Sequence, residues 1–308
     1  MKEIRIGIIG LDTSHVIRFT EILNNAKDPY HVEGGKIIAA FPGGSEDLKA
    51  SWSRLEGFRK ELEEKWKIKM MDNISDLTKE VDAILLESVD GRKHLPQFKE
   101  CINAGAKVPV FIDKPLAANL NDAKEIFRLA KKEEIPVFSS SSLRFDINIT
   151  KALSETQEGR ILGCEACSPA SLEPTNPGFY WYGIHGCEIL YTAMGPGCQR
   201  VWCIGNKDYD LAVGLWKDGR VGTMRGIRKG EGWVYGCTLY REKGIKRVTA
   251  SSTIPFYARL LEEIIKFFRT GKPPINPEET LEIMAFIDAA NRSKENEGRG
   301  EPLRLEKD

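Results

Sequence analysis

A lysine at the end of a short apolar run is the first residue in this chain that could do chemistry. Val110-Phe111-Ile112 is typical of a buried strand in a parallel sheet, and the strand should end at Asp113-Lys114-Pro115 because proline cannot continue a ladder. Ligands bind at the carboxyl ends of such strands. A lysine there can orient a substrate hydroxyl or lower its pKa, although an isolated Lys-Pro is more often a surface loop entrance.

The turn after the first strand is a second candidate site. Ile4–Ile9 predicts a buried strand that runs into Gly10-Leu11-Asp12-Thr13-Ser14-His15 and then a helix. A dinucleotide fingerprint, G-x-G-x-x-G, belongs here, but only its first glycine is present; Asp12 and His15 occupy the other two positions. Asp12 adds bulk and charge near the expected pyrophosphate, whereas helix N–H groups and two hydroxyls can still donate. Asp12 either caps its own helix or contacts the ligand, and both readings stay open.

The choice of cofactor is also open. The second expected strand, Lys36–Phe41, continues into Pro42-Gly43-Gly44, with no acid to bind the ribose hydroxyls of NAD. Lys49 is too far along the chain to argue for the 2′-phosphate of NADP.

Two histidines are further candidates for a role in chemistry. His94 opens a helix after the expected strand Val81–Leu86 and its continuation Glu87-Ser88, a position where histidine usually caps or packs. His185 follows the aromatic run Phe179–Tyr182, which either stacks on a sugar ring or belongs to the core. Taken alone, His185 is structural about as often as it is functional.

The order of elements predicts an α/β protein with two domains. Strands alternate with helices from Ile4 to Phe138, which favours a doubly wound parallel sheet in a Rossmann domain at 1–140. From 161 to 252 the chain has the pattern of glycine-punctuated hairpins, so 141–308 should be an α+β domain with an open, mainly antiparallel sheet. The closing helices, Tyr257–Arg269 and Glu278–Ser293, can pack back on the first domain.

Composition excludes several classes of protein. The 308 residues hold 45 basic and 45 acidic side chains, so no net positive field is available to bind nucleic acid. No apolar run approaches the roughly 20 residues of a membrane span, and the N-terminus has no signal-peptide pattern. Seven dispersed cysteines predict reduced thiols and a cytoplasmic location. In a strand, Cys164 and Cys167 would face opposite sides, so no metal site is expected.

These motifs, in this order and spacing, resemble the Gfo/Idh/MocA family, the group of glucose–fructose oxidoreductase and inositol dehydrogenase. The matching segments are Ile8-Ile9-Gly10, Val81-Asp82-Ala83 with His94, Asp113-Lys114-Pro115-Leu116, Arg144-Phe145, Gly183-Ile184-His185 with Glu188, and Arg269–Pro273.

The resemblance implies an NAD(P)-dependent oxidoreductase that acts on a hydroxyl or carbonyl group of a sugar, polyol or related small molecule. It implies that Lys114, before a cis proline, holds the substrate hydroxyl, that His185 is the acid or base, and that the open sheet forms a homo-oligomer. The expected cofactor contacts are Gly10, Asp12, Thr13, Ser14, His15, Ser88, His94 and Lys114. The expected substrate contacts are Arg144, Tyr180, Trp181, Tyr182 and Glu188. One departure is Trp181, which stands where the family often has an aspartate four residues before the histidine.

Two other functions remain open at this point. The lost glycines, the missing ribose acid and Trp181 favour a degenerate Rossmann protein that binds or regulates without hydride transfer. A third reading retains NAD for a non-redox lyase or epimerase reaction.

Overall fold

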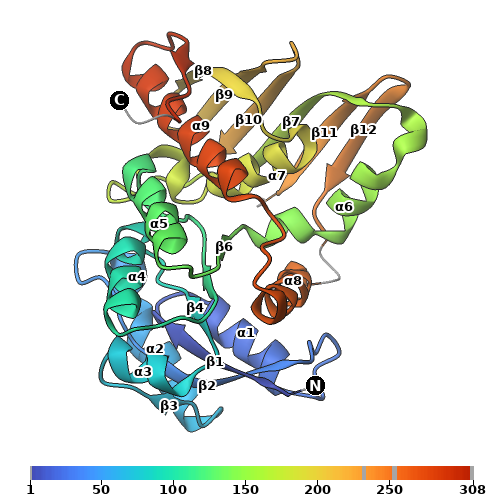
Figure 1. Ribbon diagram of the computed structural model, residues 1–308. Helices are drawn as coiled ribbons and strands as arrows, with labels where there is room; N and C mark the ends of the chain where they lie inside the picture. The colour runs from blue at the N-terminus through green and yellow to red at the C-terminus, as the bar shows by residue number, and fades with distance from the viewer. Residues whose placement is uncertain (1, 231–233, 252–254, 306–308) are drawn as a thin grey trace. The chain divides into compact units, whose positions relative to one another are not determined.

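The computed structural model describes residues 2–230, 234–251 and 255–305. The chain divides into two compact units (Figure 1). The first comprises Met1–Ala117, Asn121–Ser140 and Tyr257–Ile275, and the second comprises Ala118–Leu120, Ser141–Phe256 and Asn276–Asp308.

The first unit is built on a six-stranded sheet in the order β3-β2-β1-β4-β5-β6. All of its paired strands are parallel. This is the strand order of dinucleotide-binding folds, which place ligands where the order reverses, beside β1 and β4. The strands are β1 (Ile4–Ile9), β2 (Gly35–Phe41), β3 (Lys69–Met70), β4 (Ala83–Leu86), β5 (Val110–Ile112) and β6 (Val137–Ser139).

Helices cover both faces of this sheet because consecutive residues of β1 point in opposite directions. On one side, the Ile6 side chain lies with Ile265 of α8 around Gly35; on the other, Gly7 faces Leu77 of α3. The helices are α1 (His15–Asn24), α2 (Lys49–Glu64), α3 (Ile74–Glu80), η1 (Gly91–Lys93), α4 (His94–Asn103), α5 (Leu120–Lys132) and α8 (Phe256–Thr270).

A late segment of the chain completes the core of the first unit. Phe138 of β6 makes edge-to-face contacts with Phe111 of β5 and with Phe267 of α8, at centroid distances of 5.2 and 5.6 Å. All three rings are fully buried. The apolar face of α8 therefore serves the first unit, although the helix follows most of the second unit in sequence.

The second unit is built on a seven-stranded sheet in the order β12-β11-β7-β10-β9-β8-β13. Its neighbours are antiparallel except for β7 and β10, which run parallel. The strands are β7 (Ile161–Pro169), β8 (Cys198–Gly205), β9 (Tyr209–Trp216), β10 (Val221–Ile227), β11 (Gly236–Arg241), β12 (Gly244–Thr249) and β13 (Glu301–Pro302).

Helices pack on this second sheet, and the burial pattern of its strands shows that they cover one face. In β9, Ala212, Gly214 and Trp216 are buried and alternate with half-buried Leu211 and Val213. Gly186 lets α7 approach the sheet, because a Cβ there would lie 2.6 Å from Met224 Cε. The helices are η2 (Ser142–Phe145), α6 (Ile147–Ser154), η3 (Thr156–Glu158), η4 (Gly178–Tyr180), α7 (Ile184–Met194) and α9 (Pro277–Glu295) (Figure 1).

The expected fold class is confirmed, with an N-terminal parallel doubly wound sheet and a mainly antiparallel C-terminal sheet. Two points differ from the sequence analysis. β3 and α3 were not predicted, although Asn73 accepts from the Asp76 amide as an N-cap, which is a readable signal. The pair β7–β10 is parallel because a crossover, not a hairpin, joins them. No helix within the described residues is both long and apolar enough to cross a membrane.

Candidate functional site

The carboxyl ends of β1 and β4 approach each other at Gly10. This glycine has a φ of +89°, and a Cβ there would lie only 2.3 Å from Ser88 Oγ and 2.5 Å from the Ser88 amide nitrogen. Only glycine accepts both constraints. On the other side, the amides of Gly10 and Leu11 donate to the carbonyls of Phe41 and Pro42 at 2.9 and 2.8 Å, so β1 and β2 stay paired into the turn.

Asp12 ties this turn to two neighbouring segments. Ser51 Oγ of α2 donates to one carboxylate oxygen at 2.5 Å, and the Val89 amide donates to the other at 2.9 Å. Asp12 therefore does not cap α1, whose N-cap is Ser14 without a side-chain hydrogen bond. Burial raises the pKa of Asp12, and the bonds from Ser51 and Val89 offset part of that rise.

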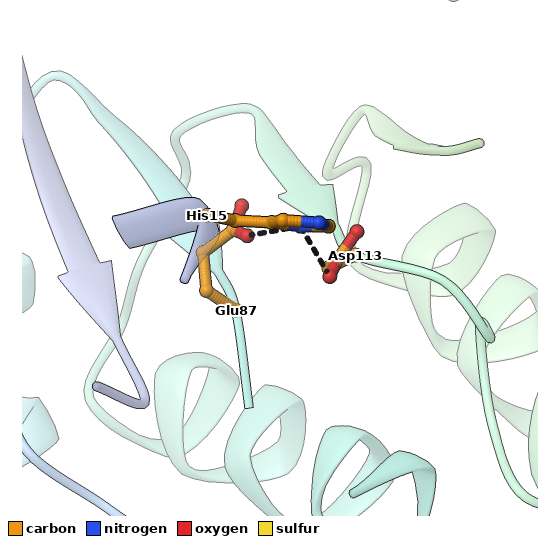
Figure 2. Close-up of side chains that lie close together, drawn as sticks. All are labelled: His15, Glu87 and Asp113. Atoms are coloured by element: carbon orange, nitrogen blue, oxygen red, sulfur yellow. Dashed lines mark ion pairs between the residues drawn. The ribbon is translucent and has the colours of Figure 1, made fainter. Parts of the chain in front are cut away.

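Three side chains that could bind a metal meet at the same edge of the sheet (Figure 2). His15 begins α1, Glu87 follows β4 and Asp113 follows β5. His15 Nδ1 lies 2.9 Å from Asp113 Oδ2 and 3.8 Å from Glu87 Oε2. Contacts with Phe19 and Tyr257 orient the imidazole ring, with centroids 5.5 and 4.9 Å away.

The charges of this cluster are strongly coupled. Burial lowers the pKa of His15, but the Asp113 carboxylate outweighs burial, and the net result is a pKa of about 9. Burial and the charge of Asp113 raise the pKa of Glu87 to about 7. The pKa of Asp113 is lowered, since His15 and Lys114 outweigh its burial.

Lys114 is the next residue along, and its peptide bond to Pro115 is cis, as the family resemblance implied. Burial lowers the pKa of Lys114, Asp113 acts in the opposite direction, and Arg54 lowers it further. His94 lies behind this loop. Its Nε2 is 2.7 Å from the Ser88 carbonyl oxygen, and its Nδ1 is 2.9 Å from that of Pro115. The fully buried His94 ring thus links the ends of β4 and β5.

In the second unit, His185 lies in the first turn of α7 and is paired with a serine. Ser141 Oγ is 2.7 Å from His185 Nδ1, and it also accepts from the Leu143 amide at 3.2 Å. The imidazole ring also makes edge-to-face contacts with Tyr182 and Tyr235, at centroid distances of 5.8 and 5.3 Å. Ser141 therefore contacts His185 Nδ1 in a chain that has Trp181 where the family often has an aspartate.

The other expected substrate contacts lie deeper in the second unit. Arg144 Nε donates to Glu188 at 2.8 Å and its NH1 group donates to Glu279 at 2.6 Å, so Arg144 and Glu188 form a buried ion pair. Tyr180 is buried, with its hydroxyl donating to the Met284 carbonyl at 3.1 Å. Trp181 packs edge-to-face on Tyr182, the most exposed side chain of this aromatic run.

The structure thus groups the expected residues into two sets, one in each unit. The turn 10–15, Ser88, His94 and Lys114 share one edge of the parallel sheet, whereas Arg144, Tyr180–Tyr182, His185 and Glu188 surround the start of α7. The sequence analysis did not single out Ser141, Tyr235, Arg54 or the grouping of His15 with Glu87 and Asp113. Of these, only the grouping of the three residues could have been predicted from the sequence. All three flank the ends of elements that meet at one edge of a parallel sheet.

Comparison with known proteins agrees with this fold. Residues 4–140 match the oxidoreductase family with an NAD-binding Rossmann fold, so the resemblance to the Gfo/Idh/MocA oxidoreductases is confirmed. The match covers this first part of the chain.

Relatives and a solved structure add detail. The chain is 28% identical over 145 residues to YceM of Salmonella typhimurium, named as an oxidoreductase, covering 47% of this chain and 41% of YceM. It is 28% identical over 144 residues to myo-inositol 2-dehydrogenase of Thermotoga maritima, covering 44% and 42%. The matches thus span about two fifths of each relative. A scyllo-inositol dehydrogenase of Lactobacillus casei, crystallised with NAD(H) and scyllo-inositol, superimposes with a TM-score of 0.77 at 17% identity over 98% of this chain and 99% of that one.

The residues at the turn fit a nicotinamide dinucleotide. Gly10 keeps the tight approach to Ser88 that this fold requires, and a side chain there would fill the turn. The carboxylate of Asp12 is fully buried and bonded to Ser51 and Val89, so it is turned into the protein. The acid that usually binds the ribose is missing after β2, where backbone carbonyls instead pair with the glycine turn.

Asp12 should make stability depend on pH in a characteristic way. Its pKa is raised in the folded protein, so its favourable contribution is present below its ordinary pKa and is lost as pH rises. Between about pH 4 and pH 7, the wild type should therefore lose stability relative to Asp12→Asn, which stays neutral. Urea denaturation at both pH values measures the difference.

Asp12→Ala is the matched control. It leaves the Val89 amide and the Ser51 hydroxyl without their acceptor and should cost about 1–3 kcal/mol. A constant difference between wild type and Asp12→Asn across this pH range would contradict the assignment.

Proposed function

We propose that this protein is an NAD(P)-dependent oxidoreductase that acts on a hydroxyl or carbonyl group of a sugar, polyol or related small molecule. The observation that carries the proposal is Lys114, a half-buried lysine with a lowered pKa that follows the carboxyl end of β5. Lysines at this edge of a parallel sheet are suited to hold and polarise a substrate hydroxyl. The names of the two relatives, an oxidoreductase and a dehydrogenase, support the same class.

The cofactor would be held by the turn Gly10–His15 and by Ser88. When bound, a nicotinamide cofactor accepts or donates the hydride. Thr13 and Ser14 offer hydroxyl donors beside the start of α1. Asp12 and His94 are positioning residues in this proposal, because both are fully buried and bonded within the protein. Arg54 brings a positive charge near Asp12 and Lys114, and we propose that it contacts a phosphate of the cofactor.

Lys114 and His185 would divide the proton chemistry. The Lys114 ammonium holds the reacting oxygen and stabilises negative charge on it. His185 then takes the hydroxyl proton, or returns it in the reverse reaction. Because Ser141 engages Nδ1, we assign this transfer to Nε2. Ser141 orients the ring through this contact.

The aromatic residues near His185 would set the class of substrate. Tyr182 and Trp181 present ring faces that suit the C–H face of a sugar or cyclic polyol. Arg144 and Glu188, expected as substrate contacts, would act mainly through their buried ion pair, by holding η2 against α7. Tyr180 would support them from the core.

Replacing Lys114 tests the assignment directly. Lys114→Ala should lower kcat by about 10²–10⁴-fold, with little change in the Kd for NAD(H) or NADP(H). The assay follows reduction of the cofactor with myo-inositol and other polyols, and a binding titration gives the Kd. Lys107→Ala, which removes an exposed lysine of the same unit, is the control.

The double variant with His185→Gln sharpens this test. Residues that act on one substrate are not additive, so the double variant should be about as slow as the slower single variant. Unchanged turnover in Lys114→Ala would remove the catalytic assignment. No cofactor binding at millimolar concentration would favour a binding or regulatory role, and product without net cofactor reduction would favour a lyase or epimerase.

Ser141→Ala should lower kcat by roughly 10–100-fold while leaving cofactor affinity intact, since it frees the ring of His185 without touching the nucleotide. Ser141→Thr, which retains the hydroxyl, should restore part of the rate. Ser154→Ala, at the exposed end of α6, is the control. If Ser141→Ala turned over at the wild-type rate, Ser141 would not position the histidine.

We also propose a homo-oligomer formed through the face of the second sheet on which the alternate, less buried residues of β8 and β9 lie. Trp202 and Ile204 of β8 pair with Val213 and Leu211 of β9, so these four apolar side chains share one face. Ile204 is 62% exposed. An apolar sheet face of this extent is typical of subunit interfaces. A cytoplasmic location is proposed with it, because all seven cysteines are free thiols.

Ile204→Glu should convert the oligomer to monomers, because a charge would be buried at the interface without a partner. Light scattering after size-exclusion chromatography measures the mass. Leu172→Glu, at an exposed loop position outside the sheet, should leave the mass unchanged. A wild-type monomer at micromolar concentration would end this part of the proposal.

A further inference from the structure

The cluster of His15, Glu87 and Asp113 has the composition of a metal site. Each residue offers one ligand atom, and these atoms lie within 4.8 Å of one another. They come from three elements, the start of α1 and the ends of β4 and β5, so the fold itself brings them together (Figure 2). The cluster adjoins Lys114 and includes His15 of the proposed cofactor turn, but none of its three residues has a role in the proton chemistry proposed for Lys114 and His185.

The carboxylate of Glu87 is a second, independent observation that points to a bound ion. Its side chain is fully buried, yet among the described residues neither carboxylate oxygen has a hydrogen-bond donor within reach. Its ion pair with His15, at 3.8 Å, leaves both oxygens without a hydrogen bond, and burying a carboxylate in that state costs several kcal/mol in general. Glu87 faces His15, so its unused binding capacity is directed into the cluster (Figure 2).

The contact between His15 and Asp113 points the same way. Nδ1 and Oδ2 are only 2.9 Å apart, but the imidazole nitrogen is not aligned for a hydrogen bond. This ion pair therefore places two possible ligand atoms close enough together to be shared by one ion.

The spacing suits a tetrahedral ion. Bonds of about 2.0–2.2 Å place tetrahedral ligand atoms roughly 3.3–3.6 Å apart. The two measured distances from His15 Nδ1, 2.9 and 3.8 Å, lie on either side of that range. One imidazole and two carboxylates are ligands that Zn²⁺ accepts, whereas Mg²⁺ prefers oxygen alone.

We propose that His15, Glu87 and Asp113 bind one divalent metal ion per chain, of the kind represented by Zn²⁺. Binding of the ion would displace the proton of His15, whose pKa without metal is about 9, and two carboxylates with the resulting neutral imidazole then balance the charge of the ion. Phe19 and Tyr257 hold the imidazole ring in place, as supporting residues do in metal sites. A fourth position would be left for water or for an oxygen of a ligand.

The test uses the full chain, freed of metal with a chelator and without any nicotinamide cofactor. Titration of Zn²⁺ against a chromophoric chelator should give one bound ion per chain, and Mg²⁺ should not compete. Glu87→Gln and Asp113→Asn should each weaken Zn²⁺ binding by at least about 10-fold. His31→Gln, which removes a histidine elsewhere in the same unit, should bind like the wild type.

Two further measurements test the identity of the ligands without relying on Zn²⁺ affinity alone. Co²⁺ bound at this site should show visible d–d absorption without the charge-transfer band of a thiolate; that band would instead indicate cysteine ligands and overturn the proposal. Mn²⁺ should broaden the ring NMR signals of His15 in the wild type, which does not depend on any variant folding. Absence of Zn²⁺ binding at micromolar concentration, or equal affinity in Glu87→Gln, would also overturn it.

Discussion

The close approach of the Gly10 backbone to Ser88 is the constraint on which the rest of the first unit depends. It brings the ends of β1 and β4 together without an intervening side chain. Every candidate group of this unit follows from that approach. His15 begins the helix that leaves the turn, Glu87 and Ser88 end β4, and the neighbouring β5 carries Asp113 and Lys114 to the same edge.

Burying so many charges at one edge requires that they compensate one another. Asp12 is neutralised in effect by hydrogen bonds from Ser51 and Val89, while His15 lies against Asp113. Glu87 is compensated less well, because its carboxylate forms no hydrogen bond within the described residues and lies 3.8 Å from His15 Nδ1. The two fingerprint positions that lack glycine are therefore occupied by residues with defined contacts. The residues that replace them, Asp12 and His15, have acquired specific partners.

In the second unit, the proposed acid or base is oriented without a carboxylate. His185 lacks the aspartate that often accompanies it, and a serine from the start of that unit contacts its ring nitrogen instead. Aromatic contacts from Tyr182 and Tyr235 fix the plane of the ring. A proton-transfer residue can thus be oriented by a neutral hydroxyl and by packing, although a serine gives less electrostatic support to an imidazolium than a carboxylate would.

Local sequence pattern by itself determined the fold class of this protein. The alternation of apolar strands and amphipathic helices, with Pro115 ending β5, was sufficient, because periodicity and chain-breaking residues act over a few positions. The positions of Gly10, Lys114 and His185 were likewise evident from motif order. Partnerships between distant residues were not. Ser141 with His185, Asp12 with Ser51, and Glu87 with His15 join segments tens of residues apart, and only tertiary structure decides which side chains at a shared edge face each other, since burial and hydrogen-bond geometry are set by packing rather than by sequence spacing.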